Sequence, residues 1–305
     1  MLNEEVFRKR TARFQRLMRE NGIDASMIRT LSSFTYFTGI KWLRPSLLIP
    51  AEGEPTVFVF QYEAEEFAEK SWIKNLKTYR KVEELMKAVT GTIRQGGYKV
   101  VGFDYSLERD SYVLYFELFK KMNTQVEVRD VHVLIMQLRM IKDAGEIEAI
   151  KQASQIAEVG MKGAIDAIDV GVSELEVAAE AVRAVMRRGA ENPRIYVTTG
   201  PKPRVHAEPR CWSRIQQGDV IEIVLATDYH GYYSNLTRTV FIGGPSEEKR
   251  KILDAFLEAH LTAEEHLKPG VNLLEIENML KEIFERKDYG QYYVVGFTHG
   301  VGLLA

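Results

Sequence analysis

Residues 218–243 read GDVIEIVLATDYHGYYSNLTRTVFIG, and this stretch decides the fold of the second half of the chain. Two runs within it, 220–225 and 236–242, are rich in β-branched residues and predict two strands. The polar segment between them carries His230 and a glycine, which favour a turn. We therefore expect a β-hairpin here, with His230 at its tip.

Outward from this hairpin, the first half of the chain alternates between helix-like and strand-like segments. The expected helices cover 4–21, 63–69, 82–95 and 112–122, and the expected strands cover 25–28, 46–49, 56–60 and 99–103. Such alternation is typical of a compact α/β domain with a mixed or parallel sheet.

The second half has a different pattern. A long amphipathic helix is predicted to begin near Leu134, with a break at Gly145, and Ser173 is the expected N-cap of a further helix. That helix covers 174–188, a strand covers 194–199, and two helices after the hairpin cover 246–267 and 273–284. The second half is therefore predicted to be α+β.

The length of 305 residues is enough for two domains of ordinary size. The change of pattern places their boundary near residues 130–135. We predict an α/β domain over residues 1–133 and an α+β domain over residues 134–305.

Composition narrows the class of protein. The chain is 45% hydrophobic and 28% charged, with a formal net charge of -2, which does not favour binding to nucleic acid or to a membrane surface. The single cysteine, Cys211, allows no internal disulfide and suits a reducing compartment. No apolar run approaches the ~20 residues that span a bilayer. We expect a cytoplasmic protein.

Five segments, in order, resemble the pita-bread peptidase family, which includes Xaa-Pro dipeptidase, aminopeptidase P, methionine aminopeptidase and creatinase. They are FTYFTGI (34–40), LRMIKDAGEIEAIKQASQIAE (138–158), VTTGPKPRVHAEP (197–209), the hairpin at 218–243 and THGVGL (298–303). In the family, FTYFTGI would be a strand and turn of the N-terminal domain.

The resemblance implies an α/β N-terminal domain followed by an α+β pita-bread catalytic domain, with the C-terminal part of that fold apparently incomplete here. It also implies a homodimer. In the peptidases, two metal ions are held by two hairpin aspartates, one histidine and two later glutamates. The resemblance places these positions on Val224, Asn235 and His299, with the glutamates beyond residue 305.

Two of these positions carry the wrong chemistry for a pair of divalent ions. A valine has no donor atom, and an asparagine amide is neutral and does not bridge two cations as a carboxylate does. We therefore expect no metal and no other cofactor. If the chain is a metallopeptidase nevertheless, the expected cofactor is divalent Mn, Co or Zn.

Creatinase provides a precedent for hydrolysis without metal, and the histidine that acts there corresponds to His206. A histidine can take a proton from water and return it to a leaving nitrogen. Because strand residues alternate between faces, Glu222 shares a face with Val224 and is the second candidate catalytic group. A solvated or salt-bridged glutamate is the alternative for Glu222, and a simple hydrogen-bonding role is the alternative for His206.

The candidate substrate-binding residues are Arg44, Tyr233, Thr237 and His299. Arg44 lies near the place where creatinase directs an arginine at the substrate carboxylate, and guanidinium matches carboxylate. Tyr233 and Thr237 share a strand face with Asn235, which predicts a polar but neutral wall. Creatinase has a glutamate at the position of Thr237, so creatine is not the expected substrate.

Three functions remain open on the sequence alone. The preferred hypothesis is metal-independent hydrolysis of a C–N bond in a small amide or amidine, with His206 as the acid-base group. The second is an Xaa-Pro dipeptidase-like metallopeptidase acting on dipeptide-like substrates. The third is a catalytically inactive binding protein with the pita-bread fold.

Overall fold

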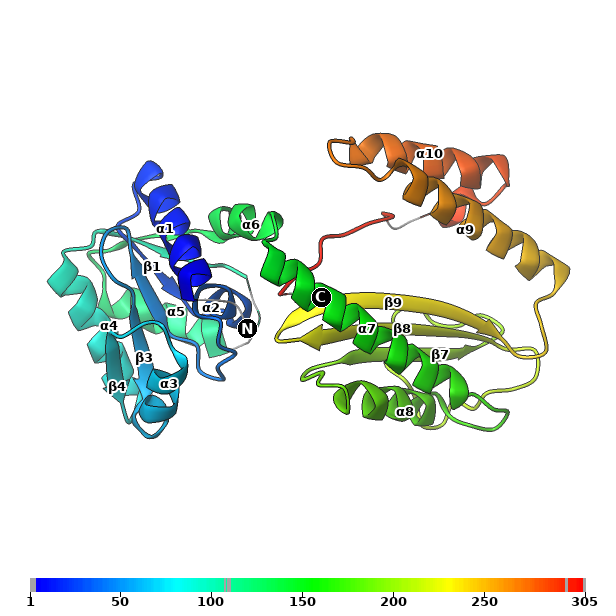
Figure 1. Ribbon diagram of the computed structural model, residues 1–305, viewed down its shortest axis with the longest axis horizontal. Helices are drawn as coiled ribbons and strands as arrows, with labels where there is room; N and C mark the ends of the chain where they lie inside the picture. Colours follow the sequence, from blue (N-terminus) through cyan, green and yellow to red (C-terminus); the bar gives the residue numbers. More distant parts are fainter. Residues whose placement is uncertain (1–3, 107, 109–110, 294–295, 304–305) are drawn as a thin grey trace. The chain divides into compact units, whose positions relative to one another are not determined.

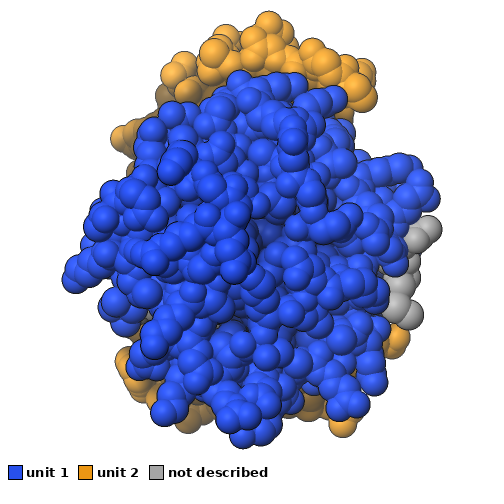
Figure 2. Space-filling model, turned by 90° about the vertical axis from the view of Figure 1, so that its left-hand side faces the viewer, with its two compact units in different colours: residues 1–153, 228–234, 302–305 blue, residues 154–227, 235–301 orange. Residues whose placement is uncertain are grey.

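The computed structural model describes residues 4–106, 108, 111–293 and 296–303, and it divides into two compact units (Figures 1 and 2). Unit 1 comprises the described residues of 1–153, 228–234 and 302–303, and unit 2 comprises those of 154–227 and 235–301. No helix in the described ranges is long and apolar enough to cross a membrane.

Unit 1 is built on a six-stranded sheet with the order β4-β3-β2-β1-β5-β6. The strands are β1 (Ala25–Ile28), β2 (Leu47–Pro50), β3 (Thr56–Phe60), β4 (Leu76–Tyr79), β5 (Val100–Phe103) and β6 (Glu127–Asp130). Strand β2 runs antiparallel to both of its neighbours, whereas the β1–β5, β5–β6 and β3–β4 pairs are parallel. The mixed sheet expected from the sequence is therefore present.

Helices cover both faces of this sheet (Figure 1). They are α1 (Glu4–Glu20), α2 (Leu31–Thr38), α3 (Ala64–Lys70), α4 (Val82–Gly96), α5 (Ser111–Met122) and α6 (His132–Met140), with a 3₁₀ turn at Gln61–Glu63. One apolar cluster joins α1, α2, α3 and α6 to the sheet, and a second joins α4 and α5 to its other face. Strand β1 shows the alternation, because Ile28 enters the first cluster and Met27 the second.

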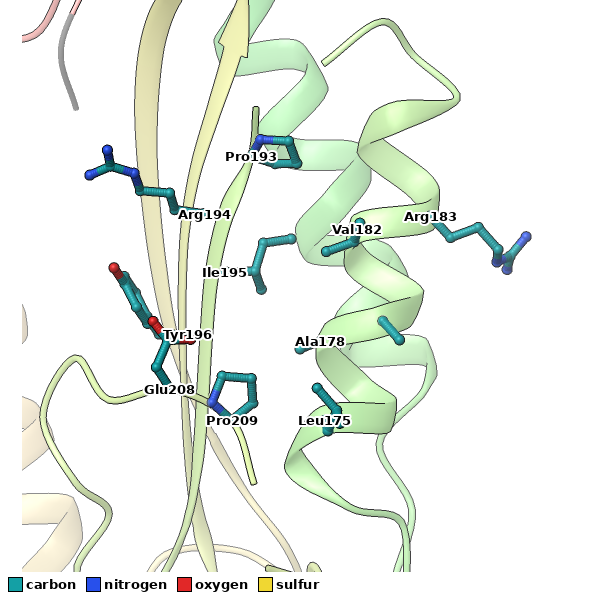
Figure 3. A pocket seen from close by; sticks show the side chains of 11 residues that line it. Leu175, Ala178, Val182, Arg183, Pro193, Arg194, Ile195, Tyr196, Glu208 and Pro209 are labelled. Atoms are coloured by element: carbon teal, nitrogen blue, oxygen red, sulfur yellow. The ribbon is translucent and has the colours of Figure 1, made fainter. Parts of the chain in front are cut away.

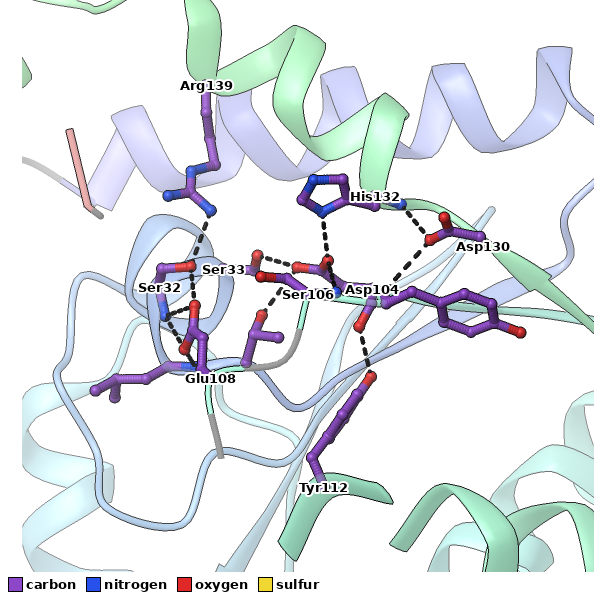
Figure 4. A network of polar contacts seen from close by, with 12 residues as sticks. Ser32, Ser33, Asp104, Ser106, Glu108, Tyr112, Asp130, His132 and Arg139 are labelled. Carbon is purple, nitrogen blue, oxygen red and sulfur yellow. Dashed lines mark hydrogen bonds and ion pairs between the residues drawn. The ribbon is translucent and has the colours of Figure 1, made fainter. Parts of the chain in front are cut away.

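The expectation of a strand and turn at FTYFTGI is wrong, because these residues lie in and just after helix α2. The carboxylate of Glu108 accepts hydrogen bonds from the backbone N–H of Leu31 and from Ser32, whose N–H lies 3.1 Å away, so the first turn of the helix is satisfied (Figure 4). Gly39 ends the helix with φ 75°, and a Cβ there would meet the ring of Phe7.

Unit 2 contains a three-stranded sheet with the order β7-β8-β9. Its strands are β7 (Arg194–Gly200), β8 (Val220–Tyr229) and β9 (Tyr232–Phe241), and its helices are α7 (Ala144–Asp166), α8 (Glu174–Met186), α9 (Glu247–His266) and α10 (Leu273–Arg286), with a 3₁₀ turn at Gly290–Tyr292. Helix α7 begins in unit 1 and continues into unit 2. Helices α9 and α10 pack on each other through their own apolar cluster.

The predicted hairpin is present, but β8 and β9 reach closer to the turn than expected. Only His230 and Gly231 separate the two strands, and both have positive φ, 51° and 81°. Two consecutive residues of this kind form the tight turn whose twist matches that of the flanking strands. The strands therefore continue up to the turn without a loop.

The predicted helix break at Gly145 is also displaced. Helix α6 ends at Met140, and Gly145 lies inside the first turn of α7. Asp143 directly precedes α7 and caps it. Its carboxylate accepts a hydrogen bond from the N–H of Glu146 at 3.0 Å, and its own N–H donates to the Glu146 carboxylate at 2.9 Å. This reciprocal cap, rather than the glycine, restarts the helix.

Buried Arg10 links several segments of unit 1 through hydrogen bonds and ion pairs. Arg10 of α1 donates to Asp143 at 2.6 Å, to the Tyr36 carbonyl of α2 at 2.9 Å and to the Tyr232 hydroxyl of the hairpin at 3.4 Å. Glu146 lies 3.3 Å from the same guanidinium, and burial raises the pKa of its carboxyl. Four separate chain segments therefore depend on one cation.

Replacing Arg10 is expected to destabilise the protein strongly. Arg10→Met keeps the aliphatic stem but leaves Asp143 and Glu146 without their cation, a loss of about 3–5 kcal/mol for a broken buried ion pair. Thermal and denaturant unfolding measure it. Arg16→Met, at an exposed ion pair on the same helix, is the matched control and should change stability by less than ~1 kcal/mol. Equal effects of the two variants would contradict the role of Arg10.

Candidate functional site

The two faces of strand β8 differ in character, and the difference defines the candidate site. Ile223 and Leu225 are fully buried, and Ile223 is paired with Val197 of β7. On the opposite face, Glu222 lies across from Thr198 and Val224 lies across from Tyr196. Glu222 and Val224 are only half-buried. The expectation that these two side chains share a face agrees with the strand register.

His299 and Asn235 are brought together in unit 2, although 64 residues separate them in the chain. The Asn235 amide nitrogen lies 3.1 Å from His299 Nε2, and His299 Nδ1 lies 3.0 Å from the Gly300 carbonyl. Both ring nitrogens of His299 therefore lie within hydrogen-bonding distance of a protein partner.

These residues do not fit a pair of divalent metal ions. No group of three or more His, Cys, Asp or Glu side chains that could hold a metal ion occurs within the described part of the chain. Val224 contributes no donor atom, and Asn235 contributes a neutral amide that lies within hydrogen-bonding distance of His299 Nε2. A divalent ion must be compensated by anionic oxygen ligands when it loses its hydration shell. The donor set described here is neutral.

His206 lies in an exposed turn between β7 and β8, and its backbone has a positive φ of 43°. Histidine adopts this left-handed conformation more often than most residues, but it is still uncommon. The side chain of His206 is exposed to solvent. His206 therefore has the accessibility that a general base requires.

The segment that carries His206 is anchored by Glu174, a fully buried carboxylate in the first turn of α8. Glu174 accepts from the Arg204 guanidinium at 2.5 Å, from the Thr199 N–H at 2.8 Å and from the Arg210 N–H at 2.9 Å. The Thr198 hydroxyl donates to the Arg204 carbonyl at 2.8 Å. Both ends of the segment are thus held by one side chain.

Sequence reasoning found Ser173 as the N-cap of α8, which the structure confirms, but missed Glu174 beside it. An acidic residue in a first helical turn is ordinary, because it interacts favourably with the helix dipole. The only further signal was Arg204, a cation in the same segment as His206.

The four proposed substrate-binding residues are divided between the two units. Arg44 and Tyr233 belong to unit 1, whereas Thr237 and His299 belong to unit 2. Arg44 pairs with Glu63, which also accepts from the Trp42 indole at 3.1 Å. Tyr233 is 7% exposed, and its N–H donates to the Gly302 carbonyl at 2.7 Å. Thr237 is exposed.

A cavity of about 700 Å³ lies between α8 and β7, outside the group of predicted site residues (Figure 3). Figure 3 shows Ile195 and Val182 directed toward each other across it, with Pro209 near one end. Glu208 and Pro209 of the His206 segment reach its wall, but His206 and Glu222 do not line it. This largely apolar hollow carries no obvious chemistry.

Comparison with known proteins matches two family descriptions in succession. Residues 10–141 match the creatinase/prolidase N-terminal domain, and residues 148–305 match metallopeptidase family M24. The chain is 31% identical to the Xaa-Pro dipeptidase of Pyrococcus furiosus over 298 residues, which cover 97% of this chain and 82% of that protein.

Solved structures give the same result. The prolidase from Pyrococcus horikoshii OT3 is 30% identical, with a TM-score of 0.84 over 97% of this chain and 82% of the other. The prolidase from Thermococcus sibiricus has a TM-score of 0.89 at 25% identity, over 99% of this chain and 83% of the other. The predicted fold, an α/β N-terminal domain followed by a pita-bread domain, is confirmed.

The similarities support an enzyme that hydrolyses C–N bonds, as predicted. They do not support placement in the metal-independent, creatinase-like branch, because these relatives are Xaa-Pro dipeptidases. They also imply a divalent metal, so the expectation that no cofactor is needed lacks their support. The neutral donor set formed by Val224, Asn235 and His299 disagrees with that implication.

Weakening the Glu174 anchor is expected to loosen the His206 segment without unfolding the protein. Arg204→Met removes one of three donors, so the amides of Thr199 and Arg210 should exchange hydrogen faster. Hydrogen exchange of the peptides covering 198–211 measures this, with Arg183→Met at an exposed pair on α8 as the control. Unchanged exchange in Arg204→Met would show that the anchor does not hold the segment.

Proposed function

This chain belongs to metallopeptidase family M24, and from that membership we propose that it hydrolyses the C–N bond of small dipeptide-like substrates of the Xaa-Pro class. The observation that carries the proposal is the similarity to Xaa-Pro dipeptidases over nearly the whole chain. Similarity confined to one domain would support the fold of that domain only.

We place substrate binding on the face of the unit 2 sheet that carries Glu222, Thr237 and His299. Glu222 and Thr237 are the polar side chains that the strand pattern leaves accessible there, and His299 is held by Asn235. A neutral, hydrogen-bonding wall suits a peptide amide better than a strongly cationic group. Arg44 and Tyr233 are further proposed substrate contacts, and the functional protein is proposed to be a homodimer.

A second candidate function, hydrolysis without metal, is favoured by one specific observation. The positions that hold metal in the family carry Val224 and an Asn235 amide hydrogen-bonded to His299, a set without negative charge. Water must then be activated by another group. His206 is the accessible histidine on an anchored segment, so it is the proposed general base.

The chemistry of this candidate is simple. The His206 imidazole removes a proton from water as the oxygen attacks the carbonyl carbon, and it returns that proton to the nitrogen as the C–N bond breaks. Glu222 would orient the substrate or the attacking water by accepting a hydrogen bond. The third possibility, a binding protein without hydrolytic activity, is an outcome of the test.

The proposals are tested by assaying Xaa-Pro dipeptides with chelator and with added Mn²⁺, Co²⁺ or Zn²⁺. If the second candidate holds, activity persists in chelator and falls by about 10²–10⁴-fold in His206→Ala, the usual contribution of acid–base catalysis. His260→Ala, at an exposed histidine of α9, is the control. Activity that chelator abolishes would leave the Xaa-Pro proposal standing and remove the second candidate. Absence of hydrolysis under every condition would refute both and favour the inactive binding protein.

Restoring carboxylates at the two altered positions is expected to create affinity for metal. The paired substitution Val224→Asp and Asn235→Asp adds two anionic oxygen donors, one of them at the residue that contacts His299. Elemental analysis after equilibration with Mn²⁺ and gel filtration should show more bound metal than in the unaltered protein, whatever the activity. Two stoichiometric ions bound to the unaltered protein would contradict the conclusion that its residues do not fit a pair of divalent metal ions.

A further inference from the structure

A second cavity, of about 570 Å³, lies in unit 1, and of the predicted site residues only Arg44 is among its described lining residues. Arg29 follows the carboxyl end of β1, Phe60 ends β3, and Tyr79 ends β4, and all three line it. The carboxyl ends of these three strands point the same way, because β1 and β3 both run antiparallel to β2 and β4 is parallel to β3. Ligands of open α/β sheets commonly bind next to the carboxyl ends of the strands.

Arg29 gives the cavity its specific character. Its guanidinium carbon lies 4.1 Å from the centre of the Tyr115 ring, which also lines the cavity. The Arg29 Nε and Nη1 atoms and the Tyr115 hydroxyl are buried, and none has a hydrogen-bond partner among the residues that the structure describes. A buried donor without an acceptor costs free energy, so such a group in a native fold calls for an explanation.

The unpartnered groups are of one kind. A guanidinium only donates hydrogen bonds. Burial raises the pKa of Tyr115 to about 12, so its hydroxyl also keeps a proton to donate at neutral pH. Tyr112, a third phenol in the wall, is already engaged, because it donates to the Asp104 carbonyl at 2.9 Å (Figure 4). Arg29 and Tyr115 are thus donors for which no described residue supplies an acceptor.

The charge of the wall points the same way. Four cations line the cavity, namely Arg29, Arg44, Arg80 and Lys81, and the described residues of its wall include no Asp or Glu. Arg44 is paired with Glu63, and the Arg80 guanidinium bonds the neutral amide of Gln61. Neither Arg29 nor Lys81 has an ion pair with any residue that the structure describes. The field inside the cavity therefore favours an anion.

Most of the remaining wall is apolar or aromatic, including Phe60, Leu85, Leu114 and Leu118. A bare inorganic anion would leave this surface without a partner. An apolar body attached to the anion would instead be removed from water against it, at about 25 cal/mol per Å² of apolar area buried.

We propose that this cavity is a binding site for a small organic carboxylate with an apolar or aromatic body, held through its carboxylate by Arg29 and Tyr115. Guanidinium recognises carboxylate through charge-assisted hydrogen bonds. The proposal does not depend on the hydrolytic function, because neither Arg29 nor Tyr115 is a proposed catalytic or substrate-binding residue there. Arg44, which also lines the cavity, is paired with Glu63 and is not needed to hold the carboxylate.

Binding of phenylacetate to the full chain tests this proposal, measured by ligand-observed NMR titration or calorimetry. 2-Phenylethanol, which has the same ring without the charge, should bind at least about tenfold more weakly, since a hydrogen bond to a charged group is lost. Arg29→Met should weaken phenylacetate binding by at least about tenfold for the same reason. Arg16→Met, an exposed arginine of α1, is the matched control and should bind as the unaltered protein does.

Tyr115→Phe keeps the test valid if Arg29→Met folds poorly. It removes only a hydroxyl that has no protein partner, so thermal stability should not fall while phenylacetate binding weakens several-fold. Unchanged binding in both Arg29→Met and Tyr115→Phe would overturn the proposal. So would inorganic phosphate binding as tightly as phenylacetate, because the apolar wall would then contribute nothing.

Discussion

The alternation of side chains along β8 is the constraint on which the candidate site depends. Ile221, Ile223 and Leu225 are fully buried, so the opposite face of the strand must carry Glu222 and Val224. Burying each large aliphatic side chain contributes about 1.5–3 kcal/mol. A shift of register by one residue would expose all three and force the Glu222 carboxylate into the core. Burial of the apolar face therefore determines which residues of β8 are accessible to a substrate.

This separation explains how whole-length similarity to Xaa-Pro dipeptidases coexists with a changed donor set. The chain is about 30% identical to these relatives over nearly its whole length, and their fold matches. Val224 and Asn235 lie on the accessible face, where a substitution leaves the core intact but changes the charge. If these two positions correspond to the family's metal-binding aspartates, as the resemblance implies, two negative charges that would compensate a dication are missing there. The Asn235–His299 hydrogen bond then satisfies the polar groups that remain.

Sequence patterns predicted the elements whose causes are local, and missed those that depend on distant residues. The strands of the hairpin follow from β-branched runs, and α8 from its capping serine. Helix α2 did not, because the carboxylate that caps it, Glu108, lies 76 residues away from the Ser32 N–H that it accepts. Strands β4 and β6 were also missed, since both are polar edge strands with accessible residues. Glu174 looks like any acidic first-turn residue until the Arg204 segment folds over it.

The His206 segment shows how a distant contact can position the proposed general base. A positive φ at a non-glycine residue costs of order 1 kcal/mol and persists only where the surroundings enforce it. Here the surroundings are the three donors that converge on buried Glu174, which fix the chain on both sides of the turn while leaving the His206 ring exposed. The rigid base and the free imidazole together suit a proton-transfer group better than they suit a simple connection between strands.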